Sequence, residues 1–256
     1  MNSWDIYRSR MESTGATKRD TLLRRKSRYL STKLPDSLSF FTVDIDGTSY
    51  DVAIVNTDNL DEKYIYSLPG EDIVPGGIVE WMDNHWLVTE KDASNELYAR
   101  AKMLQCNYLL RWVDNDGIIH EQWCVIEDGT KYLTGAYEDR DFFVTRGDSR
   151  IGMIISKNEH TTKMKRGCRF LIDDPDSETM LAYELTKPYK LGGVFNGMGV
   201  FKFVLQEVNT TDDDNPELRI ADYYKQFPRL DTCKTSQNLV IDPDNTSTED
   251  GRKVWI

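Results

Sequence analysis

The sequence predicts a mainly β protein that combines a small SH3-like β-barrel, a second β domain, a short N-terminal helix and an extended C-terminal arm. Two observations support this. Apolar residues alternate with a period of two from residue 39 onward, and pairs of such runs are joined by short Asp, Asn and Gly turns. The 256 residues suffice for one large β domain or two small ones. The predicted boundaries are 1–38 for a basic docking arm, 39–107 for the barrel, 108–209 for the second β domain and 210–256 for an acidic arm.

The N-terminal segment differs in charge from the rest of the chain. Residues 1–33 hold nine Lys or Arg and three Asp or Glu, a net charge of +6, within a chain whose total is −11. We expect a short helix capped by Thr21 and ended before Pro35, because the residue before a proline avoids the helical region. A basic arm on an acidic body suggests an acidic partner, either nucleic acid or another protein. The alternative is a solvated amphipathic helix. The predicted contact residues are Arg24, Arg25, Lys26 and Arg28.

The predicted barrel is built from hairpins. Residues 41–45 and 50–54 flank Asp46-Gly47, a favoured two-residue hairpin turn. A strand at 64–68 follows, and a second hairpin turns at Asp83-Asn84. The segment 95–103 fits either a further strand or a short helix. Tightly connected hairpins of this kind suit a small closed barrel, which hides its edges by curling.

The predicted second β domain shows the same pattern of strands joined by short turns. A hairpin turns at 114–117, and further strands are expected at 151–155, 180–185 and 200–208. Residues 165–173 parallel residues 75–83 in order: a glycine turn, an apolar strand and an acidic turn. The period is near 90 residues, which indicates a domain of related design.

The C-terminal region is too poor in apolar residues to form a core of its own. We therefore expect an extended arm over 210–256. Its last three residues, Val254, Trp255 and Ile256, are the exception, and they predict an anchor on a neighbouring subunit.

The sequence carries no recognisable catalytic motif. It lacks a nucleophile elbow, a phosphate-binding loop, a dinucleotide fingerprint and an H-E-x-x-H pair. None of the three histidines, His85, His120 and His160, lies near a Ser or Cys in a recognisable nucleophile motif, and we interpret His85 and His120 as ordinary strand or surface residues. We interpret the Asp clusters at 173–176, 212–214 and 242–244 as solvated turns rather than calcium sites. The predicted protein is not an enzyme and has no catalytic residue, cofactor or metal.

The cysteines and the hydropathy pattern indicate the cellular environment in which the protein folds. The four cysteines, Cys106, Cys124, Cys168 and Cys233, show no metal-binding spacing and are expected to be free thiols in a reducing environment. No apolar run approaches the roughly 18 residues of a membrane span. The polar N-terminus lacks the apolar core of a signal peptide.

Several runs resemble structural proteins of tailed bacteriophages of Gram-positive hosts. These are CNYLLRW (106–112), HEQWCVIEDGTKY (120–132), VTRGDSR (144–150), RFLIDD (169–174) and LRIADYY (218–224). The chain most resembles the virion neck group, that is, a head-closure (stopper) or head–tail connector protein. The hairpin at 77–88 is similar to the β-barrel of stopper proteins.

The resemblance implies a homo-oligomeric ring in the virion neck, made in the cytoplasm of the bacterial host. Its partners would be a portal or adaptor protein on the head side and a tail terminator or tail tube protein on the tail side. Genomic DNA would pass through the lumen without sequence-specific binding. An acidic body fits this, because phosphate attraction is what makes nucleic-acid contacts persistent.

A different class of function stays open at this point. A virion-surface collar or carbohydrate-binding β module would use exposed aromatic residues, for which Trp81, Trp86, Trp112 and Trp123 are the candidates. A glycan hydrolase is a third alternative, for which no acid pair can be selected.

Overall fold

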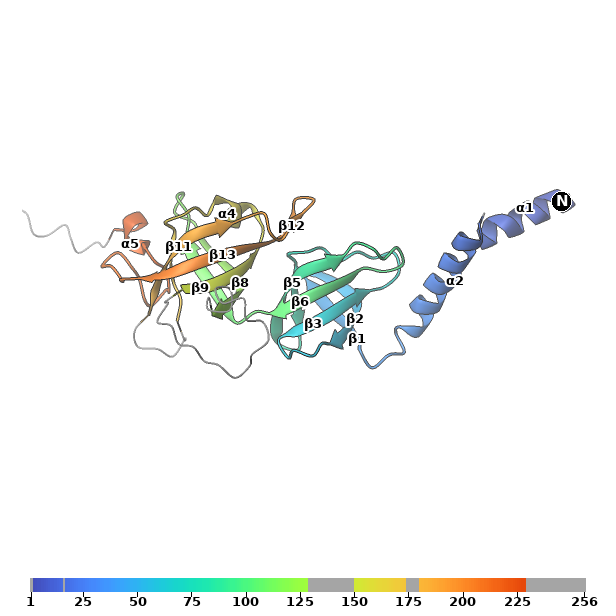
Figure 1. Ribbon diagram of the computed structural model, residues 1–256, viewed down its shortest axis with the longest axis horizontal. Helices are drawn as coiled ribbons and strands as arrows, with labels where there is room; N and C mark the ends of the chain where they lie inside the picture. The colour runs from blue at the N-terminus through green and yellow to red at the C-terminus, as the bar shows by residue number, and fades with distance from the viewer. Residues whose placement is uncertain (1, 16, 129–149, 174–179, 229–256) are drawn as a thin grey trace, which may run out of the picture.

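The computed structural model describes residues 2–15, 17–128, 150–173 and 180–228. The predicted anchor, Val254, Trp255 and Ile256, lies outside the described residues. The protein is mainly β, with two barrel-like sheets and a helical N-terminal segment. This confirms the predicted fold class. The molecule is elongated: helices lie at one end, a barrel in the middle and a second sheet at the other end (Figure 1).

The barrel closes by backbone pairing. Its strands are β1 (Phe40–Ile45), β2 (Thr48–Asn56), β3 (Glu62–Ser67), β4 (Ile78–Trp81), β5 (Asn84–Asp92) and β6 (Arg100–Gln105). The order around it is β1-β2-β3-β6-β5-β4, and β4 pairs back onto β1 with Ile45 opposite Val79. Residues 100–105 are therefore a strand, which settles the choice left open for segment 95–103.

Two tight turns set the register of the barrel hairpins. The predicted turn at Asp46-Gly47 is confirmed, and both residues have positive φ, at 51° and 80°. The turn predicted at Asp83-Asn84 is one residue out: Trp81 pairs with Asn84, and the loop is Met82-Asp83 with φ of 49° and 59°. Methionine is unusual in a left-handed position, so the sequence pointed to the Asp/Asn pair instead.

Alternation along each strand directs one set of side chains into the barrel. The barrel core contains Val43, Ile45, Val52, Ile54, Ile65, Ile73, Val79, Trp86, Val88, Ala99, Ala101 and Met103. Because side chains alternate between the two faces of a strand, the opposite face is free for other contacts.

The second sheet is antiparallel throughout. Its strands are β7 (Tyr108–Val113), β8 (Ile119–Asp128), β9 (Arg150–Ser156), β10 (Arg169–Leu171), β11 (Ala182–Tyr189) and β13 (Met198–Val208), with the short β12 (Val194–Phe195) paired to β13. The order is β10-β11-β13-β9-β8-β7. The edge strands β7 and β10 approach each other, and the Tyr108 hydroxyl donates to the Leu171 carbonyl at 2.9 Å. Fully buried Phe170, Phe201 and Phe203 lie in its core.

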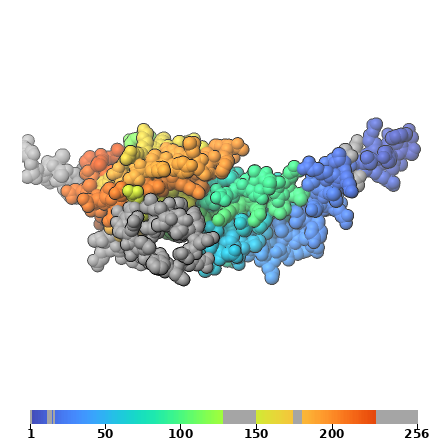
Figure 2. All heavy atoms as spheres, in the orientation of Figure 1, coloured from blue at the N-terminus to red at the C-terminus, as the bar shows by residue number. Residues whose placement is uncertain are grey.

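An apolar junction joins the two sheets. Leu87 and Cys106 from the barrel side pack with Val125, Ile154 and Val200 from the second sheet. The space-filling view shows the two parts in contact along this junction (Figure 2). The outward face of β5, which carries Leu87, therefore packs on the second sheet.

The predicted C-terminal arm begins at residue 210, but residues 210–228 are packed and not extended. This tail segment contains α5 (Tyr223–Gln226) and lies against the second sheet, with Asp214, Asn215 and Ile220 buried. Arg169 of β10 bonds Asp214 and Asp222 and so holds the segment in place. Composition indicated an extended arm because polar residues here outnumber apolar ones. The segment is held instead by buried polar pairing, together with the packing of Ala221 on Leu171 and Ala182.

The N-terminal segment forms two helices, α1 (Ser3–Thr14) and α2 (Lys18–Lys33), which we call the arm. The predicted cap at Thr21 is wrong. Thr17 is the N-cap of α2: its side chain accepts from the Asp20 N–H, and the Asp20 carboxylate accepts from the Thr17 N–H, both at 3.1 Å. This is a capping box, with Asp in place of the more usual Glu.

Candidate functional site

The candidate functional site is the basic surface of the arm. Helix α2 has no buried residue, and the predicted contact residues Arg24, Arg25, Lys26 and Arg28 are all exposed on it. A hollow on this helix is lined by Thr21, Arg24, Arg25, Arg28, Tyr29, Thr32 and Lys33. The structure therefore brings three of the four predicted basic residues together around one concave surface.

Apolar side chains are exposed on the same arm. On α1, Trp4 is 71% exposed and packs edge-to-face against Tyr7, with Met11 one turn further on. On α2, Leu22 and Tyr29 are exposed as well. Basic side chains interspersed with large exposed apolar ones are typical of an interaction surface rather than a purely solvated helix.

Few contacts hold the arm to the barrel. Nη2 of Arg19 donates to both carboxylate oxygens of Glu96, at 2.6 and 2.7 Å, but both side chains are largely exposed, so the pair contributes under about 1 kcal/mol. Leu30 and Leu34 line a groove against Tyr66 and Tyr98 of the barrel side. The rest of the arm projects away from the body (Figures 1 and 2).

The neighbouring barrel has the opposite charge. Residues 34–107 contain fourteen Asp or Glu and four Lys or Arg, a net charge of −10. On its surface a hollow beside the second sheet is lined by Asp58, Asp61, Glu62 and Glu127. Glu62 is paired with Lys102 at 2.8 Å. Basic and acidic surfaces thus occupy different places on one chain.

The four tryptophans do not form an exposed platform, which corrects the premise of the carbohydrate-binding alternative. Trp86 and Trp112 are buried, and Trp81 packs against Trp86 and the barrel core. Trp123 lies at the junction, stacked on the imidazole of His85 at 4.2 Å between ring centroids. Two of the four are buried and the other two are half-buried against core or junction residues, so they do not present a shared exposed aromatic face.

The cysteines follow the prediction where the structure describes them. Cys106, Cys124 and Cys168 are free, and the first two are buried. Burial raises the pKa of Cys106 to about 12 and raises that of Cys124 as well. These two thiols are therefore protonated and unreactive at neutral pH. Cys233 lies outside the described residues.

Sequence reasoning missed one cluster. It treated His120 and His160 as unrelated, whereas the structure places both beside Asp114, with one possible ligand atom from each residue within 4.8 Å of the others. A hydrogen bond from His120, together with the backbone N–H groups of Ile118 and Asp116, lowers the pKa of Asp114 to about 2. The only sequence signal is an Asp six residues before a His in a hairpin; nothing signals His160.

One acidic cluster that the sequence left as a solvated turn has another role. Asp214 is buried and accepts hydrogen bonds from Arg169, so one carboxylate of the 212–214 cluster belongs to a structural ion pair. Residues 174–176 and 242–244 lie outside the described residues. No described helix is both long enough and apolar enough to cross a membrane.

Comparison with known proteins adds one informative match. Residues 16–105 match the YomX N-terminal domain family. This matched segment, which covers less than half of the chain, contains α2 and the whole barrel. The family is phage-associated, and the match is consistent with a phage protein.

The other comparisons give no functional information. No curated protein matches the chain. One solved structure, described as "MrkH, A novel c-di-GMP dependence transcription regulatory factor", is similar with a TM-score of 0.23 and 9% identity, covering 77% of this chain and 87% of that chain. A likeness at this level carries no argument.

Proposed function

We propose that this protein is a structural component of the tailed-phage virion that assembles as a ring in the neck, as a head-closure or connector protein. The observation that carries the proposal is the exposed basic arm beside an acidic barrel, in a segment that matches a phage-associated family. The portal or an adaptor protein would lie on the head side, and a tail terminator or tail tube protein on the tail side. In this role the protein is not an enzyme.

Assembly would use the arm in a head-to-tail contact. The basic surface around Arg24, Arg25 and Arg28 of one copy faces the acidic hollow around Asp58 and Asp61 of the next copy. Because the two surfaces differ, the contact is heterologous, and a heterologous contact generates a ring when its rotation closes. Complementary potentials of this kind fix orientation and register.

The charge distribution also suits a DNA channel. With +6 in residues 1–33 and −11 in total, the remainder of the chain carries −17. A wall of this sign repels phosphate, so genomic DNA would pass without being retained. No sequence-specific contact is required.

The decisive test is electron cryomicroscopy of intact virions, with the neck reconstructed under both imposed and relaxed symmetry. We expect density for this chain as a ring between portal and tail. Density on fibres, capsid surface or baseplate would overturn the neck proposal and favour a collar or host-attachment role.

A charge-reversal variant tests the arm itself. The triple variant Arg24→Glu, Arg25→Glu, Arg28→Glu should remain folded by circular dichroism but fail to enter the neck, because like charges would then face each other. The matched control is Lys165→Glu, Arg166→Glu, Lys187→Glu, which reverses three exposed positive charges on β11 and on the loop before β10. Normal incorporation of the arm variant, or equal failure of the control, would contradict an arm-specific contact.

A further inference from the structure

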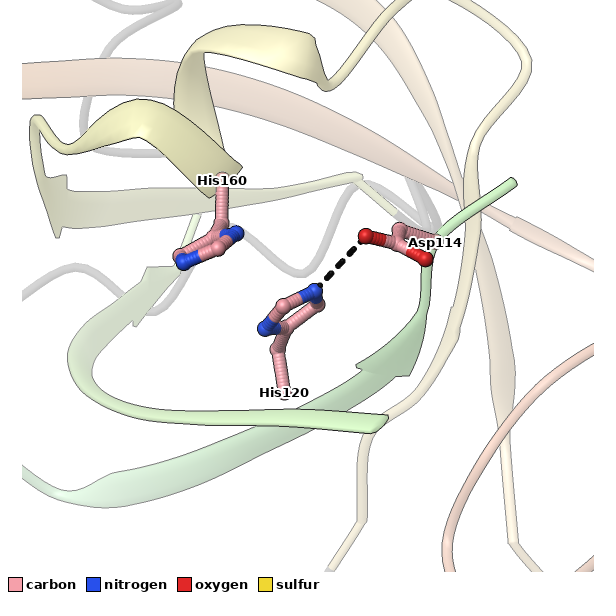
Figure 3. Close-up of side chains that lie close together, drawn as sticks. All are labelled: Asp114, His120 and His160. Carbon is pink, nitrogen blue, oxygen red and sulfur yellow. Dashed lines mark hydrogen bonds and ion pairs between the residues drawn. The ribbon is translucent and has the colours of Figure 1, made fainter. Parts of the chain in front are cut away.

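A cluster of two imidazoles and a carboxylate lies on the second sheet, far from the arm. Asp114 follows β7, His120 lies in β8, and His160 lies in α4 (Glu159–Lys163). Figure 3 shows the three side chains converging from the hairpin and the short helix. The cluster plays no part in the proposed assembly function and can be tested independently of it.

The carboxylate is fixed before any ligand binds. One oxygen, Oδ1 of Asp114, accepts the backbone N–H groups of Asp116 at 2.9 Å and Ile118 at 3.0 Å. The other, Oδ2, lies 2.9 Å from Nε2 of His120. The turn after β7 therefore orients the carboxylate toward the imidazole.

The helix that carries His160 is tied to the strand that carries His120. Asn158 caps α4 by accepting the Thr161 N–H at 2.8 Å, and its amide donates to Oε1 of Gln122 at 2.7 Å. This bond joins residues that lie two positions from each histidine. The two imidazole rings stack with their centroids 4.0 Å apart.

The two histidines differ in how their nitrogens are used. His120 is largely buried, beside Trp112, and engages Asp114. His160 is exposed, and within the described residues its ring has the stacking contact but no hydrogen-bond partner. A purely structural Asp–His pair would not need the second imidazole, whose free nitrogens are available to a ligand.

We propose that Asp114, His120 and His160 bind a divalent transition-metal ion of the Zn²⁺ class. Two imidazole nitrogens and one carboxylate oxygen form a ligand set that suits Zn²⁺, with a fourth position for water. Ligand bonds of about 2.0–2.2 Å place the ligand atoms roughly 3.3 Å apart in a tetrahedral site. The three ligand atoms lie within 4.8 Å of one another here, so binding one ion requires a small rotation of the exposed His160 side chain. The ion would cross-link the β7–β8 hairpin to α4.

The test is calorimetric titration of the untagged, chelator-treated full chain with Zn²⁺. We expect one ion per chain, and at least a tenfold loss of affinity in His160→Gln. The matched control is His85→Gln, since His85 lies at the junction outside the cluster; its affinity should equal that of the unchanged protein. Zn²⁺ should also raise the thermal midpoint of the unchanged protein and not that of His160→Gln.

A second measurement excludes binding by the free thiols. The Co²⁺ complex should show the ligand-field bands of nitrogen and oxygen ligands without a thiolate charge-transfer band. Absence of Zn²⁺ binding, equal affinity in His160→Gln, loss of affinity in His85→Gln, or a thiolate band would each overturn the proposal.

Discussion

The barrel and the second sheet have similar strand paths but close in different ways. In the barrel, β4 pairs with β1 and completes a ring of backbone hydrogen bonds. In the second sheet, β7 and β10 meet through the Tyr108 hydroxyl, and the tail segment covers the β10 side. Backbone closure uses only local alternation and turns, whereas side-chain closure needs specific partners from distant parts of the chain.

A single arginine organises the second kind of closure. The Arg169 guanidinium donates to Asp222 at 2.7 Å, to Asp214 at 2.9 Å and to the Asn209 carbonyl at 3.0 Å. Asp214 also accepts the N–H groups of Thr211 and Asp222. Arg169 is the cationic partner of the buried Asp214, so removing it leaves a buried carboxylate with its backbone hydrogen bonds but without a neutralising charge.

The largest expected effect therefore comes from Arg169→Met. It leaves Asp214 buried and uncompensated, which typically costs about 3–5 kcal/mol. We expect the tail segment to detach and the second sheet to lose stability, while the barrel amides stay protected from hydrogen exchange. Hydrogen exchange read by mass spectrometry measures each part separately.

The control for this prediction lies three residues away. Arg166 is exposed, so Arg166→Met should change the free energy of unfolding by less than about 0.5 kcal/mol. Equal loss of protection in the barrel and the second sheet of Arg169→Met would show that the two parts do not differ in the way their closure suggests.

These two modes of closure explain how much the sequence predicted. The Asp46-Gly47 hairpin, the 108–113 and 119–128 hairpin and the mainly β class follow from alternation and turn chemistry. The Arg169–Asp214 pair spans 45 residues, and no local pattern marks it. The basic arm residues were found because charge is visible in composition, whereas His160 was missed because it lies in α4 and its neighbours, Asp114 and His120, come from the β7–β8 hairpin.

The next effect concerns the junction that the two parts share. Gly76 has φ of +93°, and a Cβ added there would lie 2.4 Å from the Gly199 carbonyl oxygen of the second sheet. Gly76→Ala combines backbone strain with a clash between two main chains, so we expect a loss of about 2–4 kcal/mol. Urea unfolding with separate readouts for barrel and second sheet should show them unfolding less cooperatively.

Gly70→Ala separates strain from the clash. Gly70 has a matching φ of +95° and open space around its Cβ position. Gly70→Ala should lose about 1–2 kcal/mol of stability, from backbone strain alone, and the barrel and the second sheet should still unfold together. If the two alanine variants were equally destabilised, the contact between Gly76 and Gly199 would not contribute to the junction.

The smallest effect is a pH dependence confined to the second sheet. Burial alone would raise the pKa of Asp214, but hydrogen bonds from the N–H groups of Asp222 and Thr211 and from Arg169 lower it overall. A carboxylate whose folded pKa lies below its unfolded value, about 3.9, contributes its full stability above that value. The contribution disappears as the pH falls through the folded pKa.

Urea unfolding at pH 7, 5, 4 and 3 measures this contribution, with Asp214→Asn as the comparison. At pH 7 the variant should be the less stable protein, because Asn cannot replace the charge facing Arg169. The difference should narrow as the pH falls below about 4, because the unfolded chain then binds a proton at Asp214, and the folded protein does so once the pH passes its lower folded pKa. Because Asp214 lies outside the barrel and the barrel's own ion pairs, such as Lys102–Glu62, are more exposed than Arg169–Asp214, the exchange protection of the barrel should respond equally in both proteins. A constant difference across the pH range would mean that Asp214 stabilises the tail segment through hydrogen-bond geometry rather than charge.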